Sequence, residues 1–200
     1  MKGGAHICAK RLMDKGDIRP AIIAMPSDGL WGDGSGYLSH NEKDFAQWIV
    51  SDVPNAIKEN LDAASDKSLL CIGGLSMGGY GAMMMGAKYP SKFKAISAHS
   101  AITKFEQMAQ FVEEPLEQYG ILDSEKNVID IIRKQTADLP ALRFDCGVKD
   151  NLLEANRTLH QELSALNIPH VYEEFEGGHE WSYWQKHVEQ SLMFFDQQMV

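Results

Sequence analysis

The residues most suggestive of chemistry are a serine and two glycines in Gly74-Leu75-Ser76-Met77-Gly78. This G-x-S-x-G pattern follows a short apolar run and precedes a helix-like stretch, which is the strand–turn–helix context of a nucleophilic serine. The glycines leave room for the sharp turn, and we expect a Cβ at either Gly74 or Gly78 to crowd it. The Met77 N–H, at the start of the helix, is placed to stabilise an oxyanion. The pattern also occurs by chance, but its context predicts Ser76 as a nucleophile.

A serine hydroxyl needs a base to take its proton and a carboxylate to orient that base. On a doubly wound hydrolase sheet these partners follow later strands, in the chain order Ser, Asp or Glu, His. Asp150 comes after the apolar run 142–146 and a short turn, and His179 follows the last strand-like run in a Gly-Gly loop. Order and loop placement therefore predict Asp150 as the orienting acid and His179 as the base.

Two alternatives remain open for these roles. Asp145 is a rival acid, but it lies inside an apolar run, where a buried, hydrogen-bonded strand carboxylate is expected. His99 ends the strand-like run after the nucleophile helix, so it is a rival base and a candidate group on the substrate side. The remaining histidines are expected on helices, at a strand start or in a loop, with no role in the chemistry.

A Gly-rich loop at 26–41 follows a predicted parallel strand, so it should lie on the side of the sheet where ligands bind. Trp31 and Tyr37 are therefore candidate walls of a substrate pocket, and a solvated surface turn is an equally good interpretation. The loop fits neither a dinucleotide-binding fingerprint nor an EF-hand. We predict no cofactor and no metal site.

Apolar periodicity predicts alternating strands and helices that would position these residues. The expected strands are 20–25, 68–73, 93–98, 142–146 and 169–175. The expected helices are 5–15, one from Asp44 that kinks or restarts at Pro54, 78–88, 152–166 and 181–198. Residues 101–138 interrupt this alternation with helix-like pieces, interpreted as an insertion that packs in the core or caps the site. The pattern predicts one α/β domain over residues 1–200, with a mostly parallel sheet and helices on both faces.

The composition of the 200 residues, 44% hydrophobic and 24% charged, is that of a compact folded chain. A net charge of −9 argues against a broad basic surface, so no nucleic-acid partner is expected. No apolar run approaches the roughly 20 residues of a membrane-spanning helix. Three widely spaced cysteines and an N-terminus without a secretory signal favour reduced thiols and a cytoplasmic location.

Three stretches together resemble a known family. Residues 73–82 (GGLSMGGYGA), 147–153 (GVKDNLL) and 177–184 (GGHEWSYW) resemble the esterase D-like, or "putative esterase", family of α/β-hydrolases. The resemblance implies an α/β-hydrolase fold with Ser76, Asp150 and His179 as its Ser-His-Asp triad. It implies a serine carboxylesterase that acts on a short-chain ester or thioester through an acyl-enzyme and needs no cofactor. An acyltransferase with the same triad is the alternative.

The resemblance also implies an N-terminal shortening. Family members carry, before the region matching Pro20 to Pro26, a strand and a His-Gly-rich loop whose N–H completes the oxyanion hole, and we expect this chain to lack that segment and the leading strands of the sheet. Loss of one oxyanion donor typically costs about 10²–10³ in kcat, so a catalytically impaired fragment or interaction module is a further alternative. If a signal peptide was lost together with that segment, secretion would also be compatible with the sequence. The oligomeric state stays open, a homo-oligomer included.

Overall fold

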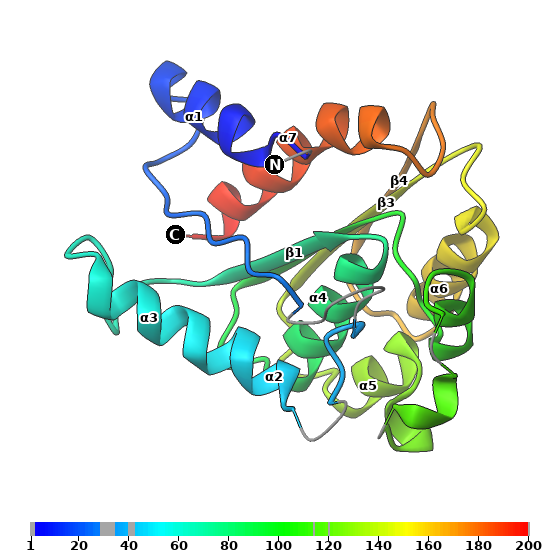
Figure 1. The fold of residues 1–200 in the computed structure, drawn as a ribbon. Coiled ribbons are helices and arrows are strands. Elements are labelled where there is room, and N and C mark those ends of the chain that lie inside the picture. Colours follow the sequence, from blue (N-terminus) through cyan, green and yellow to red (C-terminus); the bar gives the residue numbers. More distant parts are fainter. Residues whose placement is uncertain (1–2, 29–34, 40–42, 114, 120, 200) are drawn as a thin grey trace.

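A parallel sheet forms the centre of the protein (Figure 1). The structure, a computed structural model, describes residues 3–28, 35–39, 43–113, 115–119 and 121–199. Within these residues the sheet has four strands in spatial order, β1 (Cys71–Leu75), β2 (Ala95–His99), β3 (Ala141–Gly147) and β4 (Val171–Phe175). Every neighbouring pair is parallel, so the predicted α/β class is confirmed.

Helices cover both faces of this sheet (Figure 1). On one side α4 (Met77–Lys88) packs on β1 and β2, next to α5 (Val128–Lys134) and α6 (Leu153–Ala165). On the other side α1 (Ala5–Lys15) packs on α7 (Trp181–Gln198), and α7 lies against β2 and β3. The two-sided cover matches the expectation, and the bounds of α1 and α7 are those predicted from the sequence.

The helical stretch after Asp44 is built from three pieces. The Asp44 carboxylate accepts the Gln47 N–H at 2.9 Å and caps α2 (Phe45–Gln47). A π-helical turn over Trp48–Asp52 then leads into α3 (Val53–Asn60), which has Pro54 in its first turn. Proline is tolerated there because the first N–H groups of a helix have no intrahelical acceptor. The predicted start at Asp44 is confirmed, and at Pro54 the helix continues from the π-helical turn into α3 without a break.

The strand predicted at 20–25 is wrong. These residues have no strand pairing, and the side chains of Ile22 and Met25 are about half exposed. A strand needs a neighbouring strand for its ladder of hydrogen bonds, and in the described part of the chain β1 pairs only with β2. The segment is instead fixed at its start by Arg19, whose side chain bonds Asp196 and the Met199 carbonyl at the end of α7.

The insertion at 101–138 is helical, as predicted, but in short pieces. Three 3₁₀ turns, Phe105–Gln110, Leu116–Gln118 and Asp123–Glu125, precede α5. Phe105 and Met108 from the first turn are buried in the main core together with the apolar side of α5. These apolar residues of the segment therefore serve packing.

The two faces of β2 and β3 differ in chemistry. Toward α4, the side chains are apolar and belong to the main core: Ile96, Ala98, Leu142 and Phe144. Toward α7, beside the small Ala95, four buried side chains are polar: Ser97, His99, Arg143 and Asp145. A buried polar side chain costs free energy unless it is hydrogen-bonded, so α7 must supply partners to this polar layer.

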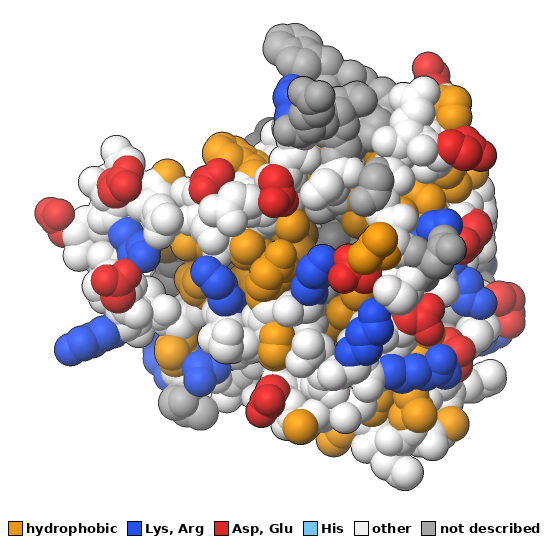
Figure 2. Space-filling view, turned by 90° about the horizontal axis from the view of Figure 1, so that it is seen from below, with side chains coloured by type: hydrophobic (Ala, Val, Ile, Leu, Met, Phe, Trp, Pro, Cys, Tyr) orange, Lys and Arg blue, Asp and Glu red, His pale blue; other side chains and the backbone are white. Residues whose placement is uncertain are grey.

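Basic and acidic side chains are interspersed on the face of the molecule that Figure 2 shows, around a small group of hydrophobic side chains. This face therefore offers no continuous basic surface. Among the described residues, none of the helices combines the length and the apolar character needed to cross a membrane.

Candidate active site

Ser76 lies in a sharp turn between β1 and α4. Its backbone has φ 53° and ψ −119°, a left-handed conformation that is unusual for a residue with a side chain. The Ser76 N–H donates to the His99 carbonyl at 2.8 Å, and the Ser76 carbonyl accepts the Tyr80 N–H at 3.1 Å. The end of β2 and the first turn of α4 thus hold the strained turn in place.

The glycines around Ser76 differ in how much room they have. A Cβ on Gly74 would lie 2.2 Å from the Gly78 carbonyl oxygen, a distance that no relaxation of a side chain could relieve. A Cβ on Gly78 would meet only the Tyr37 ring, at 3.9 Å, which is an ordinary contact. The expectation that both glycines are sterically required is therefore right for Gly74 and wrong for Gly78.

Asp150 lies in the turn that follows β3. Its N–H donates to the Gly147 carbonyl at 3.0 Å, and its carboxylate accepts the Leu152 N–H at 2.8 Å. Burial by itself would raise the pKa of Asp150, but hydrogen bonds from His179 and from the Leu152 N–H hold that pKa below its ordinary value. The carboxylate is therefore kept ionised.

The His179 ring lies between Asp150 and Ser76 and is hydrogen-bonded to both. Its Nδ1 atom lies 3.0 Å and 3.1 Å from the two carboxylate oxygens of Asp150, and its Nε2 atom lies 2.9 Å from the Ser76 Oγ. With the Nδ1–H donated to the carboxylate, Nε2 is free to accept the serine proton. The structure thus brings the three residues predicted from the sequence into one hydrogen-bonded series.

Two aromatic rings flank the imidazole. The Phe111 ring lies 5.3 Å from the His179 ring between centroids, and the Trp184 ring lies at 4.9 Å in an edge-to-face arrangement. Phe111 follows the first 3₁₀ turn of the insertion, and Trp184 belongs to α7. Sequence reasoning missed Phe111, because nothing in the spacing of the insertion indicates which residue reaches the site.

Two of the residues expected at the substrate site, Met77 and Tyr37, both lie at helix α4. Met77 is the first residue of α4, so its N–H has no acceptor within the helix. The Tyr37 ring packs on the same helix, 2.6 Å from where a Cβ of Gly81 would lie. Trp31 lies outside the described residues.

The alternative acid and base pair with one another. His99, which is 5% exposed, has its Nδ1 atom 2.8 Å from Asp145 Oδ2 and its Nε2 atom 2.7 Å from the Ser191 hydroxyl of α7. Both side chains therefore belong to the polar layer beneath α7, and the carboxylate and imidazole that lie at Ser76 are those of Asp150 and His179.

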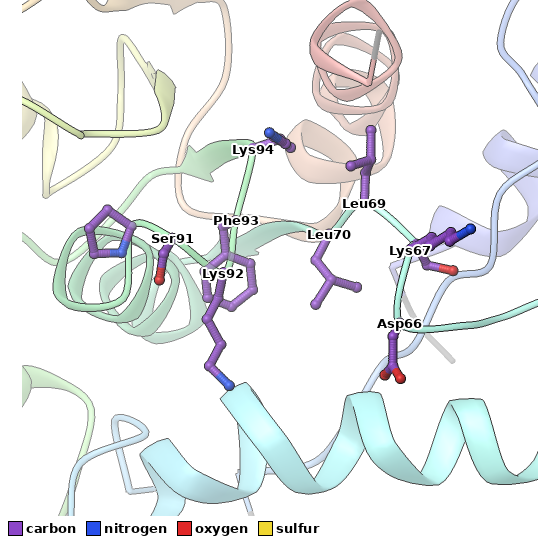
Figure 3. A pocket seen from close by; sticks show the side chains of 10 residues that line it. Asp66, Lys67, Leu69, Leu70, Ser91, Lys92, Phe93 and Lys94 are labelled. Atoms are coloured by element: carbon purple, nitrogen blue, oxygen red, sulfur yellow. The ribbon is translucent and has the colours of Figure 1, made fainter.

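A cavity of about 450 Å³ lies at the opposite end of the sheet (Figure 3). It is lined by residues 66–70, which precede β1, and 90–94, which precede β2. Its three lysines, Lys67, Lys92 and Lys94, point in different directions and do not converge on one ligand position. Because Ser76 follows the carboxyl end of β1, this cavity is separate from the candidate active site.

The comparison with protein families agrees with this geometry. The model of the family described as "Putative esterase" matches residues 8–195. The chain belongs to this esterase family. Membership makes it an enzyme that hydrolyses esters, as the sequence resemblance implied.

Individual relatives support the same assignment. The esterase is similar to the acetyl esterase of Caldicellulosiruptor saccharolyticus, with 27% identity over 91% of this chain and 74% of the relative. Among solved structures it is similar to a ferulic acid esterase, with a TM-score of 0.77, 23% identity and coverage of 100% of this chain and 78% of that one. An S-formylglutathione hydrolase from Agrobacterium tumefaciens has a TM-score of 0.71 at 20% identity, covering 94% and 79%. These two likenesses establish the α/β-hydrolase fold.

Proposed function

We propose that the esterase is a serine carboxylesterase that works through an acyl-enzyme formed on Ser76. The observation that carries the proposal is the hydrogen-bonded series from Ser76 Oγ through the His179 ring to the Asp150 carboxylate. Acyl transfer to a serine needs this arrangement, because the hydroxyl is a weak nucleophile until a base accepts its proton. The esterase family supplies the reaction class, and the geometry supports the residue roles.

In the first half-reaction Ser76 Oγ forms a bond to the ester carbonyl carbon while its proton moves to His179 Nε2. Asp150 stabilises the imidazolium and fixes the ring orientation. The Met77 N–H is the proposed donor to the oxyanion of the tetrahedral intermediate. The intermediate collapses when the bond to the leaving alcohol or thiol breaks and the imidazolium returns its proton to that group.

In the second half-reaction water takes the place of the leaving group. His179 removes a proton from the water as its oxygen attacks the acyl carbon, and the same proton then returns to Ser76 as the ester bond to the enzyme breaks. The products are a carboxylic acid and free enzyme. The chemistry needs no cofactor.

The proposed substrate is an ester with a short acyl group. The name of the acetyl esterase that the chain resembles supports it. p-Nitrophenyl acetate is therefore the first substrate to test, and p-nitrophenyl esters of longer acids define the limit.

The decisive experiment compares Ser76→Ala with Ser91→Ala, a change at an exposed serine before β2. We expect Ser76→Ala to lower kcat by at least about 10⁴-fold and to abolish labelling by a fluorophosphonate, with mass spectrometry placing the label on Ser76. Ser91→Ala should match the wild type. A Ser76→Ala variant that keeps the wild-type rate would exclude the proposed mechanism.

A further inference from the structure

We propose that Tyr183 is a positioning residue, which fixes the His179 loop through a hydroxyl anchored on the buried Asp145. The inference rests on the proposed role of His179 as the base. It concerns the residues that hold the imidazole in place rather than those that touch the substrate.

Asp145 is the centre of the polar layer beneath α7. Its carboxylate is fully buried and accepts a hydrogen bond from Arg143 at 2.6 Å, with the His99 ring at 2.8 Å. The other carboxylate oxygen accepts the Tyr183 hydroxyl at 2.7 Å. With the Arg143 guanidinium tied in turn to Glu173 on β4, Asp145 is held by two neighbouring strands and offers Tyr183 a rigid acceptor.

Tyr183 contacts the His179 loop with its ring and its backbone. Gly177 lies so close to the ring that a Cβ there would be 2.7 Å from Tyr183 Cδ2. The Tyr183 N–H donates to the Glu180 carbonyl at 3.1 Å, directly after His179. One residue therefore touches the loop on both sides of the histidine while its hydroxyl is bound to the sheet.

The loop is held from the other side by the turn that carries the acid. The Gly177 carbonyl accepts the Lys149 N–H at 2.9 Å, next to Asp150. Gly147 leaves room for this contact, since a Cβ there would lie 2.4 Å from the Gly177 oxygen. The loop is thus clamped between the acid turn and the Tyr183 ring, so a shift of that ring moves His179 relative to Asp150.

Ser191 provides a matched control within the same layer and the same helix. Its hydroxyl is 6% exposed and bonds His99 Nε2 at 2.7 Å and Ser97 Oγ at 2.6 Å. It lies two turns beyond Tyr183 along α7, away from the His179 loop. Tyr183→Phe and Ser191→Ala each remove one buried hydroxyl from the network, but only the first removes a contact that anchors the loop.

The test measures kcat and KM for p-nitrophenyl acetate at a temperature where circular dichroism shows both variants folded. We expect Tyr183→Phe to lower kcat and the rate of fluorophosphonate labelling by about 10- to 100-fold with little change in KM, because small misplacements of a catalytic group are costly. Ser191→Ala should lower Tm comparably and leave kcat within about twofold of wild type. Equal kcat values for the two variants would overturn the inference.

If Tyr183→Phe does not fold, Gly177→Ala places a methyl group against the Tyr183 ring and also strains the loop backbone, because Gly177 has φ 136°. It should lower kcat with KM retained, and a wild-type kcat would overturn the inference. The outcome is separable from that of the proposed function. An inactive Ser76→Ala together with a fully active Tyr183→Phe rejects only the role of Tyr183, whereas an active Ser76→Ala rejects the triad itself.

Discussion

His179 Nε2 lies 2.9 Å from Ser76 Oγ although 103 positions separate the two residues in the chain. Parallel strands explain the contact, because each crossover returns the chain to the same end of the sheet, and the carboxyl ends of β1, β3 and β4 lie together there. The predictions below follow from this convergence and from the packing that supports it.

Replacing Asp150 by Asn should lower kcat strongly. The amide can no longer fix the imidazole tautomer or stabilise the imidazolium, and a loss of about 10³- to 10⁴-fold is expected. Steady-state hydrolysis of p-nitrophenyl acetate measures it. Glu176→Gln, at an exposed carboxylate just before the His179 loop, is the control and should keep the wild-type rate. A drop of less than tenfold for Asp150→Asn would contradict the role of Asp150.

The acidic limb of the kcat/KM profile should report one titrating group. Burial would raise the pKa of Asp150, but its hydrogen bonds hold the pKa below the ordinary 3.8, so the carboxylate stays ionised where the enzyme is folded and active. Activity should then rise with pH with a logarithmic slope of one, because Asp150 is already ionised and does not contribute a second proton to this limb. Tryptophan fluorescence at each pH confirms that the protein is folded. A slope of two would show that Asp150 titrates in the same range.

Gly74 and Gly78 should respond differently to alanine. Gly74→Ala forces a methyl group against the Gly78 carbonyl and should abolish esterase activity or folding. Gly78→Ala meets only the Tyr37 ring, and removing a helical glycine should stabilise the fold by about 0.5–1 kcal/mol. Thermal unfolding and p-nitrophenyl acetate hydrolysis distinguish the two variants. A Gly74→Ala variant with the unfolding temperature and the activity of the wild type would show that the turn tolerates a Cβ at Gly74.

His187 should make the protein less stable at acidic pH. Its ring is 3% exposed, is stacked on Phe175, and has no hydrogen-bond partner on either nitrogen among the described residues. Burial lowers its pKa from the ordinary 6.5, with Asp145 acting in the opposite direction and Lys186, His99 and Arg143 adding to the decrease. The unfolded chain binds more protons between the two pKa values, so stability rises with pH across that window and is lost below it.

Phenylalanine at position 187 should remove this part of the pH dependence, because it keeps the ring stacking and cannot be protonated. Urea unfolding at pH 5 and pH 8 measures the effect. The difference in stability between the two pH values should shrink in His187→Phe and stay unchanged in His6→Gln, at an exposed histidine of α1. An unchanged difference in His187→Phe would assign the acid sensitivity to other groups.

The sequence carries most of the positional information for the site. The order of Ser76, Asp150 and His179, each beyond a strand-like run, reflects local patterns of apolar residues, and the bounds of α7 follow from its helical periodicity. The segment 20–25 shows the limit of such patterns. Its apolar residues suit a strand, but strand formation depends on a neighbouring partner that a local pattern does not reveal.

The side-chain partners beneath α7 illustrate a second limit. From the sequence Asp145 is a rival acid even though it lies inside an apolar run, and His99 is a rival base because it ends the strand-like run after the nucleophile helix. Only the packing of α7 shows that Tyr183 and Ser191 bind them. Contacts between residues distant in the chain depend on helix position, which apolar spacing alone does not determine.

The polar layer also limits how α7 can sit on the sheet. A helix that packs only on apolar side chains can shift along its axis by one turn at a modest cost in free energy, because one aliphatic contact replaces another. Here such a slip would separate Tyr183 from Asp145 and Ser191 from His99, leaving buried donors and acceptors unmatched. The hydrogen bonds therefore restrict the last helix to one position along the sheet.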